Sequence, residues 1–108
     1  MNPGRFELCL KVRDFAASVG FYKKLGFTET ISWKESGYST LVNGNCVISL
    51  YKDDIDGNIL NFRGGDVAQI AKELGIPSEI EHDGSIGAWI TDPDGNVIYF
   101  NTAPDEKP

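Results

Sequence analysis

The chain has 108 residues and a mass of 11.9 kDa, the size of one domain with a core of its own. Apolar residues make up 41% and charged residues 24%, which is typical of globular proteins and argues against disorder. The formal net charge of −6 excludes the basic surface that nucleic acids and anionic membranes require. A neutral or cationic small molecule is the easier ligand to accommodate.

The cysteines and the chain start favour the cytoplasm. Cys9 and Cys46 lie in apolar stretches without CxxC spacing, so we expect two buried, free thiols. We see no basic-then-apolar leader and no apolar run approaching about 18 residues, and therefore expect neither secretion nor a membrane span.

The first half of the sequence predicts one strand, one helix and three further strands. Strict alternation from Phe6 to Val12 is typical of a half-buried strand. Asp14 is placed to cap a helix that Gly26 ends. Three strands are expected at about 27–34, 37–43 and 46–52, and Asn43-Gly44-Asn45 indicates a hairpin between the last two.

The second half repeats this order. A strand at 58–63 precedes a helix that is capped by Asp66, ended by Gly75 and prevented from continuing by Pro77. Strands are expected at about 78–82, 85–91 and 96–102, with Asp92–Asn96 as the last turn. Asp66 follows Asp14 by 52 positions, and the hairpin turns share nearly the same offset.

The repeat predicts an α+β fold in which two βαβββ modules form a cupped mixed β-sheet with helices outside. Residues 1–108 are expected to be a single domain, with module one at about 5–52 and module two at about 57–102. The polar tail Ala103–Pro108 is expected to fray.

On the predicted strands, the alternate residues that do not face the helices are a mixture of polar and aromatic types. They could line a small-molecule cavity, or alternatively form a solvated outer face of the sheet. These residues are Glu7, Cys9, Lys11, Val47, Ser49, Tyr51, Ile59, Asn61, Arg63, Val97, Tyr99 and Asn101.

Two motifs resemble those of the vicinal oxygen chelate superfamily, the group of glyoxalase I, bleomycin-resistance proteins and extradiol dioxygenases. Leu10–Asp14 with Phe21–Phe27 resembles the opening "V-x-D…FY…LGF" pattern, and Thr91–Phe100 resembles the closing "DPDGN" hairpin. The resemblance covers nearly the whole chain. It implies the fold, whereas activities on this scaffold range from isomerases to metal-free drug binders.

The resemblance also implies where a divalent metal would be bound. The four family positions carry over to Glu7, Ser49, Ile59 and Tyr99. Glu7 is a competent ligand, Ser49 and Tyr99 are poor ones, and Ile59 cannot coordinate. We therefore expect no metal and no other cofactor.

We predict a metal-free protein of the glyoxalase and bleomycin-resistance type that binds a small molecule in the cup. The alternative is a divergent lyase or isomerase that uses Glu7 as its base. Whether the chain is an enzyme stays open. The expected ligand-binding residues are Glu7, Ser49, Tyr51, Ile59, Arg63 and Tyr99.

Each candidate side chain also has an ordinary structural explanation. Glu7 could simply pair with Lys11 or Arg63, and Arg63 could instead anchor a ligand carboxylate. An aromatic clamp could form from Trp33, Tyr38, Tyr51, Trp89 and Tyr99, although aromatic residues in strands more often only pack. Cys9 is expected to be a small buried hydrophobe and His82 a surface residue.

A homodimer is predicted because a cupped sheet leaves strand edges that small proteins usually cover. Short proteins that resemble the bleomycin-resistance group commonly pair by two-fold contacts. Pairing would set the first strand, around Phe6–Leu10, against the partner's second module, with the Asp105–Lys107 tail free. The alternative is a monomer whose two modules close on each other.

Overall fold

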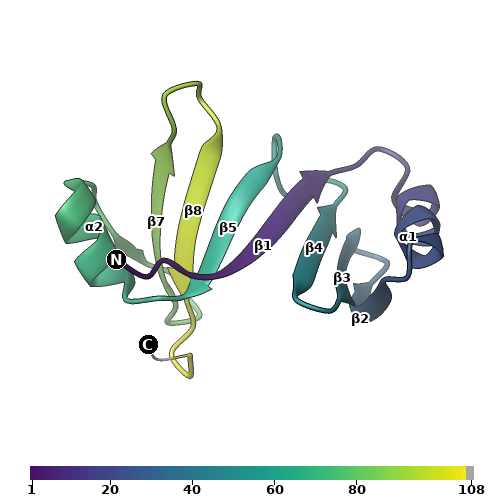
Figure 1. Ribbon diagram of the computed structural model, residues 1–108, viewed down its shortest axis with the longest axis horizontal. Coiled ribbons are helices and arrows are strands. Elements are labelled where there is room, and N and C mark those ends of the chain that lie inside the picture. Colours follow the sequence, from purple (N-terminus) through teal and green to yellow (C-terminus); the bar gives the residue numbers. More distant parts are fainter. Residues whose placement is uncertain (107–108) are drawn as a thin grey trace. The chain divides into compact units, whose positions relative to one another are not determined.

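A computed structural model describes residues 1–106. It contains eight strands and two helices within this range, and these divide between two compact units (Figure 1). The first unit is Glu7–Asn58. The second unit comprises Met1–Phe6 together with residues 59–106, so β1 (Gly4–Lys11) contributes to both.

The first unit carries a mixed sheet in the strand order β2-β3-β4-β1. β1 runs parallel to β4 (Cys46–Tyr51), with Cys9 opposite Ser49 and Lys11 opposite Tyr51. β3 (Tyr38–Asn43) pairs antiparallel with β4 and with β2 (Thr28–Trp33), and the β2–β3 register shifts between Glu29 and Ile31. α1 (Phe15–Lys24) packs beside these strands, as Figure 1 shows.

The second unit repeats the arrangement in the order β5-β8-β7-β6. β5 (Ile59–Gly64) runs parallel to β8 (Val97–Thr102), which pairs antiparallel with β7 (Ile86–Thr91). The short β6 (Glu79–Ile80) continues the sheet beyond β7. α2 (Val67–Leu74) packs against β7 and β8.

Each unit has its own hydrophobic core between its helix and one face of its sheet. In the first unit Leu41, Ile48 and Leu50 are buried against α1 residues. In the second unit Val67, Ile70, Ala71, Ala88 and Phe100 form the buried cluster. Side chains alternate along a strand. The residues that alternate with the core residues therefore lie on the other face of each sheet, as the sequence predicted.

The α+β class and the two βαβββ modules are confirmed, and both helices start where the sequence places their caps. Asp14 accepts a hydrogen bond from the Ala17 amide at 3.1 Å, and Asp66 accepts one from the Gln69 amide at 3.2 Å. The single-domain assignment and the closure of both sheets into one cup stay predictions. In the part of the chain described, no helix is long and apolar enough to cross a membrane.

Two expectations are wrong. Cys46 is a free thiol but is exposed, because it begins β4 directly after the tight Asn43–Asn45 turn; Cys9 is buried, as predicted. The tail does not fray in its described part, since Glu106 is held by two arginines. Lys107 and Pro108 lie outside the described residues.

Candidate functional site

An aromatic ladder crosses the face of the first unit that is turned away from α1. Trp33 on β2 packs on Tyr38 of β3, with ring centroids 5.1 Å apart, and Tyr38 packs edge-on against Tyr51 of β4 at 4.9 Å. The register places Trp33 opposite Tyr38 and Tyr38 opposite Tyr51, so neighbouring strands supply one ring each. Trp33 is 61% exposed. The ladder therefore runs from a half-buried phenol to an indole open to solvent.

A cluster of hydroxyl groups lies next to the ladder on the same face. The Tyr38 hydroxyl is 2.6 Å from Thr40 Oγ1, and Thr40 Oγ1 is 3.2 Å from Ser49 Oγ. Thr40 and Ser49 are buried. Because a hydroxyl both donates and accepts, this chain of groups can reorient toward a polar atom placed beside the rings.

Strand β1 borders this face in the first unit. Its alternate residues Glu7, Cys9 and Lys11 lie on the same face. Burial is the main cause that raises the pKa of Tyr51. Cys9 and Tyr38 disfavour the phenolate further, and the Glu7 carboxylate adds to the effect. Tyr51 is therefore a neutral phenol at physiological pH. Lys11 Nζ donates to the Lys52 carbonyl at 2.5 Å, so an exposed backbone oxygen engages this ammonium group.

The corresponding face of the second unit carries a second aromatic pair. Trp89 on β7 stacks on Tyr99 of β8 with centroids 3.9 Å apart and planes 23° apart. The Tyr99 hydroxyl lies over Gly87, where a Cβ would come within 2.3 Å of the oxygen, so a larger residue there would push the phenol ring aside. Burial raises the pKa of Tyr99, and the charge of Glu81, whose carboxylate lies 3.5 Å from the hydroxyl, acts in the same direction.

Arg63 is one of the alternate residues of β5 expected to line the ligand site. Its side chain is bound by the C-terminal tail. Its Nη2 donates to the Glu106 carboxylate at 2.6 Å, and Arg5 Nη2 donates to the other oxygen of that carboxylate at 2.6 Å. The Arg63 hydrogen bond is the main reason that the pKa of Glu106 falls to about 2, with Arg5 also contributing. The bridge is therefore fully charged throughout the neutral pH range.

The structure brings the predicted residues together in two sets. Glu7, Ser49 and Tyr51 lie on adjacent strands of the first unit, whereas Ile59, Arg63 and Tyr99 lie on adjacent strands of the second. The aromatic clamp likewise divides into the Trp33 ladder and the Trp89–Tyr99 stack. His82 is exposed, as predicted.

Sequence reasoning missed Thr40 and Arg5. Thr40 could have been placed by applying the Asn43–Asn45 hairpin register, which sets it opposite Ser49. Arg5 could have been suspected from the paired glycines at 64 and 65. Such glycines mark not only a turn but also a place where another backbone segment, here the N-terminal one, comes close.

The positions implied for a family metal do not form a suitable donor set. Ser49 Oγ is committed to the hydroxyl cluster, Ile59 has no donor atom, and the Tyr99 phenol is held protonated beside Glu81. Within residues 1–106, no group of three or more histidine, cysteine, aspartate or glutamate side chains is arranged to hold a metal ion. Glu7 alone would remain as a strong ligand.

Solved structures share this fold over nearly their whole length. A glyoxalase/bleomycin resistance protein/dioxygenase superfamily member from Vibrio splendidus matches with a TM-score of 0.74 and 15% identity, covering 92% of this chain and 97% of the other. A Legionella pneumophila protein described as an NAD-dependent benzaldehyde dehydrogenase matches with a TM-score of 0.71 and 18% identity, over 91% and 98% of the two chains.

The Streptomyces coelicolor methylmalonyl-CoA epimerase, solved with 2-nitronate-propionyl-CoA, matches with a TM-score of 0.61 and 17% identity, over 94% and 95% of the two chains. The chain therefore has the fold of the glyoxalase, bleomycin-resistance and dioxygenase superfamily. At these identities the likeness establishes the fold, and function rests on the site. No protein-family model and no curated protein matches the sequence.

Proposed function

We propose that this protein binds a planar, cationic aromatic small molecule on the sheet face of the first unit, without a metal. The observation that carries the proposal is the Trp33–Tyr38–Tyr51 ladder, which ends in an indole that is 61% exposed. Stacking on Trp33 supplies contact area at little entropic cost, and a ring cation gains further from the indole face.

The polar groups around the ladder support the same class of ligand. The hydroxyl cluster offers the half-buried Tyr38 hydroxyl to a heteroatom at the edge of a ring system, and Thr40 hydrogen-bonds that hydroxyl from behind. Glu7 is a carboxylate on the same face, and the net charge of −6 attracts cations at long range.

The alternative is a lyase or isomerase with Glu7 as base. It is favoured by a carboxylate that acts on a nearby phenol, because the Glu7 charge adds to the rise in the pKa of Tyr51 that burial, Cys9 and Tyr38 mainly cause. Fold neighbours include an epimerase that binds an acyl-CoA analogue. Turnover of methylglyoxal–glutathione hemithioacetal that is abolished by Glu7→Gln would support this alternative.

Mutation of the ladder tests the binding proposal. We expect Trp33→Ala to weaken the binding of proflavine, a planar cation, by about tenfold, because the substitution removes the exposed stacking surface. The measurement is a fluorescence titration, and 2-naphthalenesulfonate, a planar anion, should bind more weakly than proflavine to the unmodified protein.

Phe21→Ala is the matched control, since Phe21 is a comparably exposed aromatic residue (57%) on α1. It should leave proflavine affinity unchanged. Equal affinities for the Trp33→Ala and Phe21→Ala proteins would contradict the proposal.

A homodimer and a cytoplasmic location are proposed on the sequence arguments alone.

A further inference from the structure

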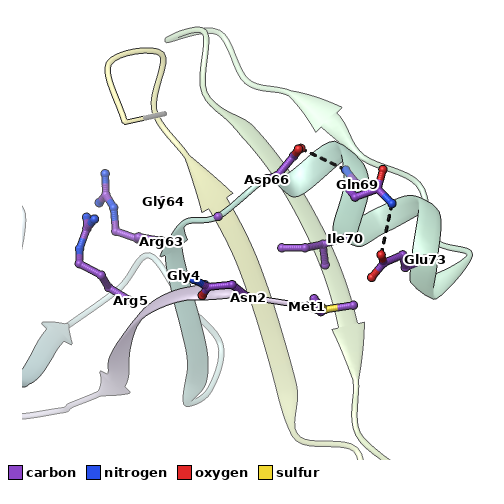
Figure 2. A pocket seen from close by; sticks show the side chains of 11 residues that line it. Met1, Asn2, Gly4, Arg5, Arg63, Gly64, Asp66, Gln69, Ile70 and Glu73 are labelled. Carbon is purple, nitrogen blue, oxygen red and sulfur yellow. Dashed lines mark hydrogen bonds between the residues drawn. The ribbon is translucent and has the colours of Figure 1, made fainter. Parts of the chain in front are cut away.

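Two arginines meet at one end of a pocket in the second unit, a site separate from the aromatic ladder. Arg5 and Arg63 both line a cavity of about 530 Å³ between the N-terminal segment and α2. Figure 2 shows their guanidinium groups side by side, while Asp66, Gln69 and Glu73 lie toward α2. This volume is within the range of pockets that hold small organic molecules.

The backbone brings these arginines together. A Cβ on Gly4 would lie 2.2 Å from the Arg63 carbonyl oxygen, and one on Gly65 would lie 2.7 Å from the Pro3 oxygen. The N-terminal segment therefore runs in direct contact with the end of β5. Arg5, the next residue, is placed beside Arg63 as a result.

The two guanidinium groups already bind a carboxylate. One Glu106 oxygen accepts from Arg5 and the other from Arg63, each at 2.6 Å, and the Ala103 amide donates at 3.2 Å to the oxygen that Arg63 contacts. Each arginine makes one charge-assisted hydrogen bond through Nη2, the kind of bond that is stronger than one between neutral groups and that arginine forms with carboxylates and phosphates. The site thus has the donors for an oxyanion, and it is filled from within the chain.

We propose that Arg5 and Arg63 form a binding site for the oxyanion of a small organic ligand, and that Glu106 occupies this site until the ligand displaces it. Arg5 is 67% exposed and Glu106 belongs to the terminal tail, so exchange requires no opening of the core. Both arginines also line the cavity, and its Met1 and Ile70 offer apolar surface to the rest of the ligand.

The far end of the cavity limits what the ligand can be. Asp66 and Glu73 line the cavity on its α2 side, where the Gln69 amide donates to Asp66 and the Gln69 side chain donates to Glu73 at 3.2 Å. A second anionic group there would be repelled. The ligand therefore carries its oxyanion at one end and an uncharged or cationic group at the other.

Removal of the internal carboxylate tests the proposal. We expect Glu106→Gln to bind phenyl phosphate or benzoate about tenfold more tightly than the unmodified protein, because a tethered competitor at millimolar effective concentration is lost. Inorganic phosphate should bind more weakly than phenyl phosphate, since it leaves the cavity empty. The two organic probes distinguish a phosphate site from a carboxylate site by calorimetric titration.

Asp105→Asn makes the same change of charge one residue away, at an exposed position, and should leave the affinity unchanged. Adding Arg5→Gln to Glu106→Gln should abolish the gain. Equal gains from Glu106→Gln and Asp105→Asn, a gain that survives Arg5→Gln, or no gain for either probe would overturn the proposal.

Should Glu106→Gln fail to fold, the unmodified protein decides the question. Saturating phenyl phosphate should shift the Arg5 and Arg63 Nε–H signals in NMR spectra, and unshifted signals would overturn the proposal. Because proflavine binding depends on Trp33 in the first unit, failure of either proposal leaves the other measurable.

Discussion

Leu50→Ala should lower the free energy of unfolding by about 3 kcal/mol. Leu50 has no exposed surface, and it packs with Leu41 and Ile48 in the core beneath α1. Truncation removes the buried methyl groups and leaves a cavity that the paired strands β3 and β4 cannot collapse to fill. Chemical denaturation with urea measures the change directly.

Leu25→Ala is the matched control in the same unit. Leu25 is 56% exposed at the end of α1, so its replacement should change the stability by less than about 0.5 kcal/mol. Similar losses for the two variants would mean that Leu50 is not in a packed core. Tyr51 follows Leu50 on β4, so Leu50→Ala should also weaken proflavine binding.

Gly4→Ala should lower the free energy of unfolding by about 3 kcal/mol through the backbone alone. Gly4 has a φ of 109°, a value that residues with a side chain rarely adopt. Its new Cβ would lie 2.2 Å from the Arg63 carbonyl oxygen, and no rotation of a side chain can relieve a clash with backbone. The N-terminal segment must then move away from β5.

Gly20→Ala is the opposite control, since nothing lies within 4 Å of the position where its Cβ would be built. Gly20 lies inside α1, where alanine is favoured over glycine by about 1 kcal/mol, so this variant should be more stable. Thermal melting of the two variants should therefore give shifts of opposite sign. A Gly4→Ala protein as stable as the original would contradict the close approach described above.

The local features of the fold could be predicted because local chemistry determines them. The helix caps at Asp14 and Asp66 follow from side chains that bind amides three residues on. Strand parity follows from the period of two, which correctly separated Leu50 from its neighbours Ser49 and Tyr51.

The features that depend on distant residues could not be predicted in this way. The sequence could not assign Trp33 to a face of the sheet. The register of β2 shifts between Glu29 and Ile31, so residues after the shift lie on the opposite face from the one that strict alternation along β2 predicts. The sequence offers Glu7 or a ligand as partners of Arg63, and it does not indicate the hydrogen bond to Glu106, which lies 43 residues further along the chain. Polar composition made this tail resemble a frayed end.

The central claim is that a planar cation stacks on Trp33 without a metal. The sequence contains two tryptophans, so their indole N–H signals can be assigned with one Trp33→Phe variant. We predict that titrating proflavine into EDTA-treated protein shifts the Trp33 indole signal to saturation and that added Zn²⁺ changes nothing. A Trp33 signal that stays in place while proflavine binds, or that moves only after Zn²⁺ is added, would contradict the claim.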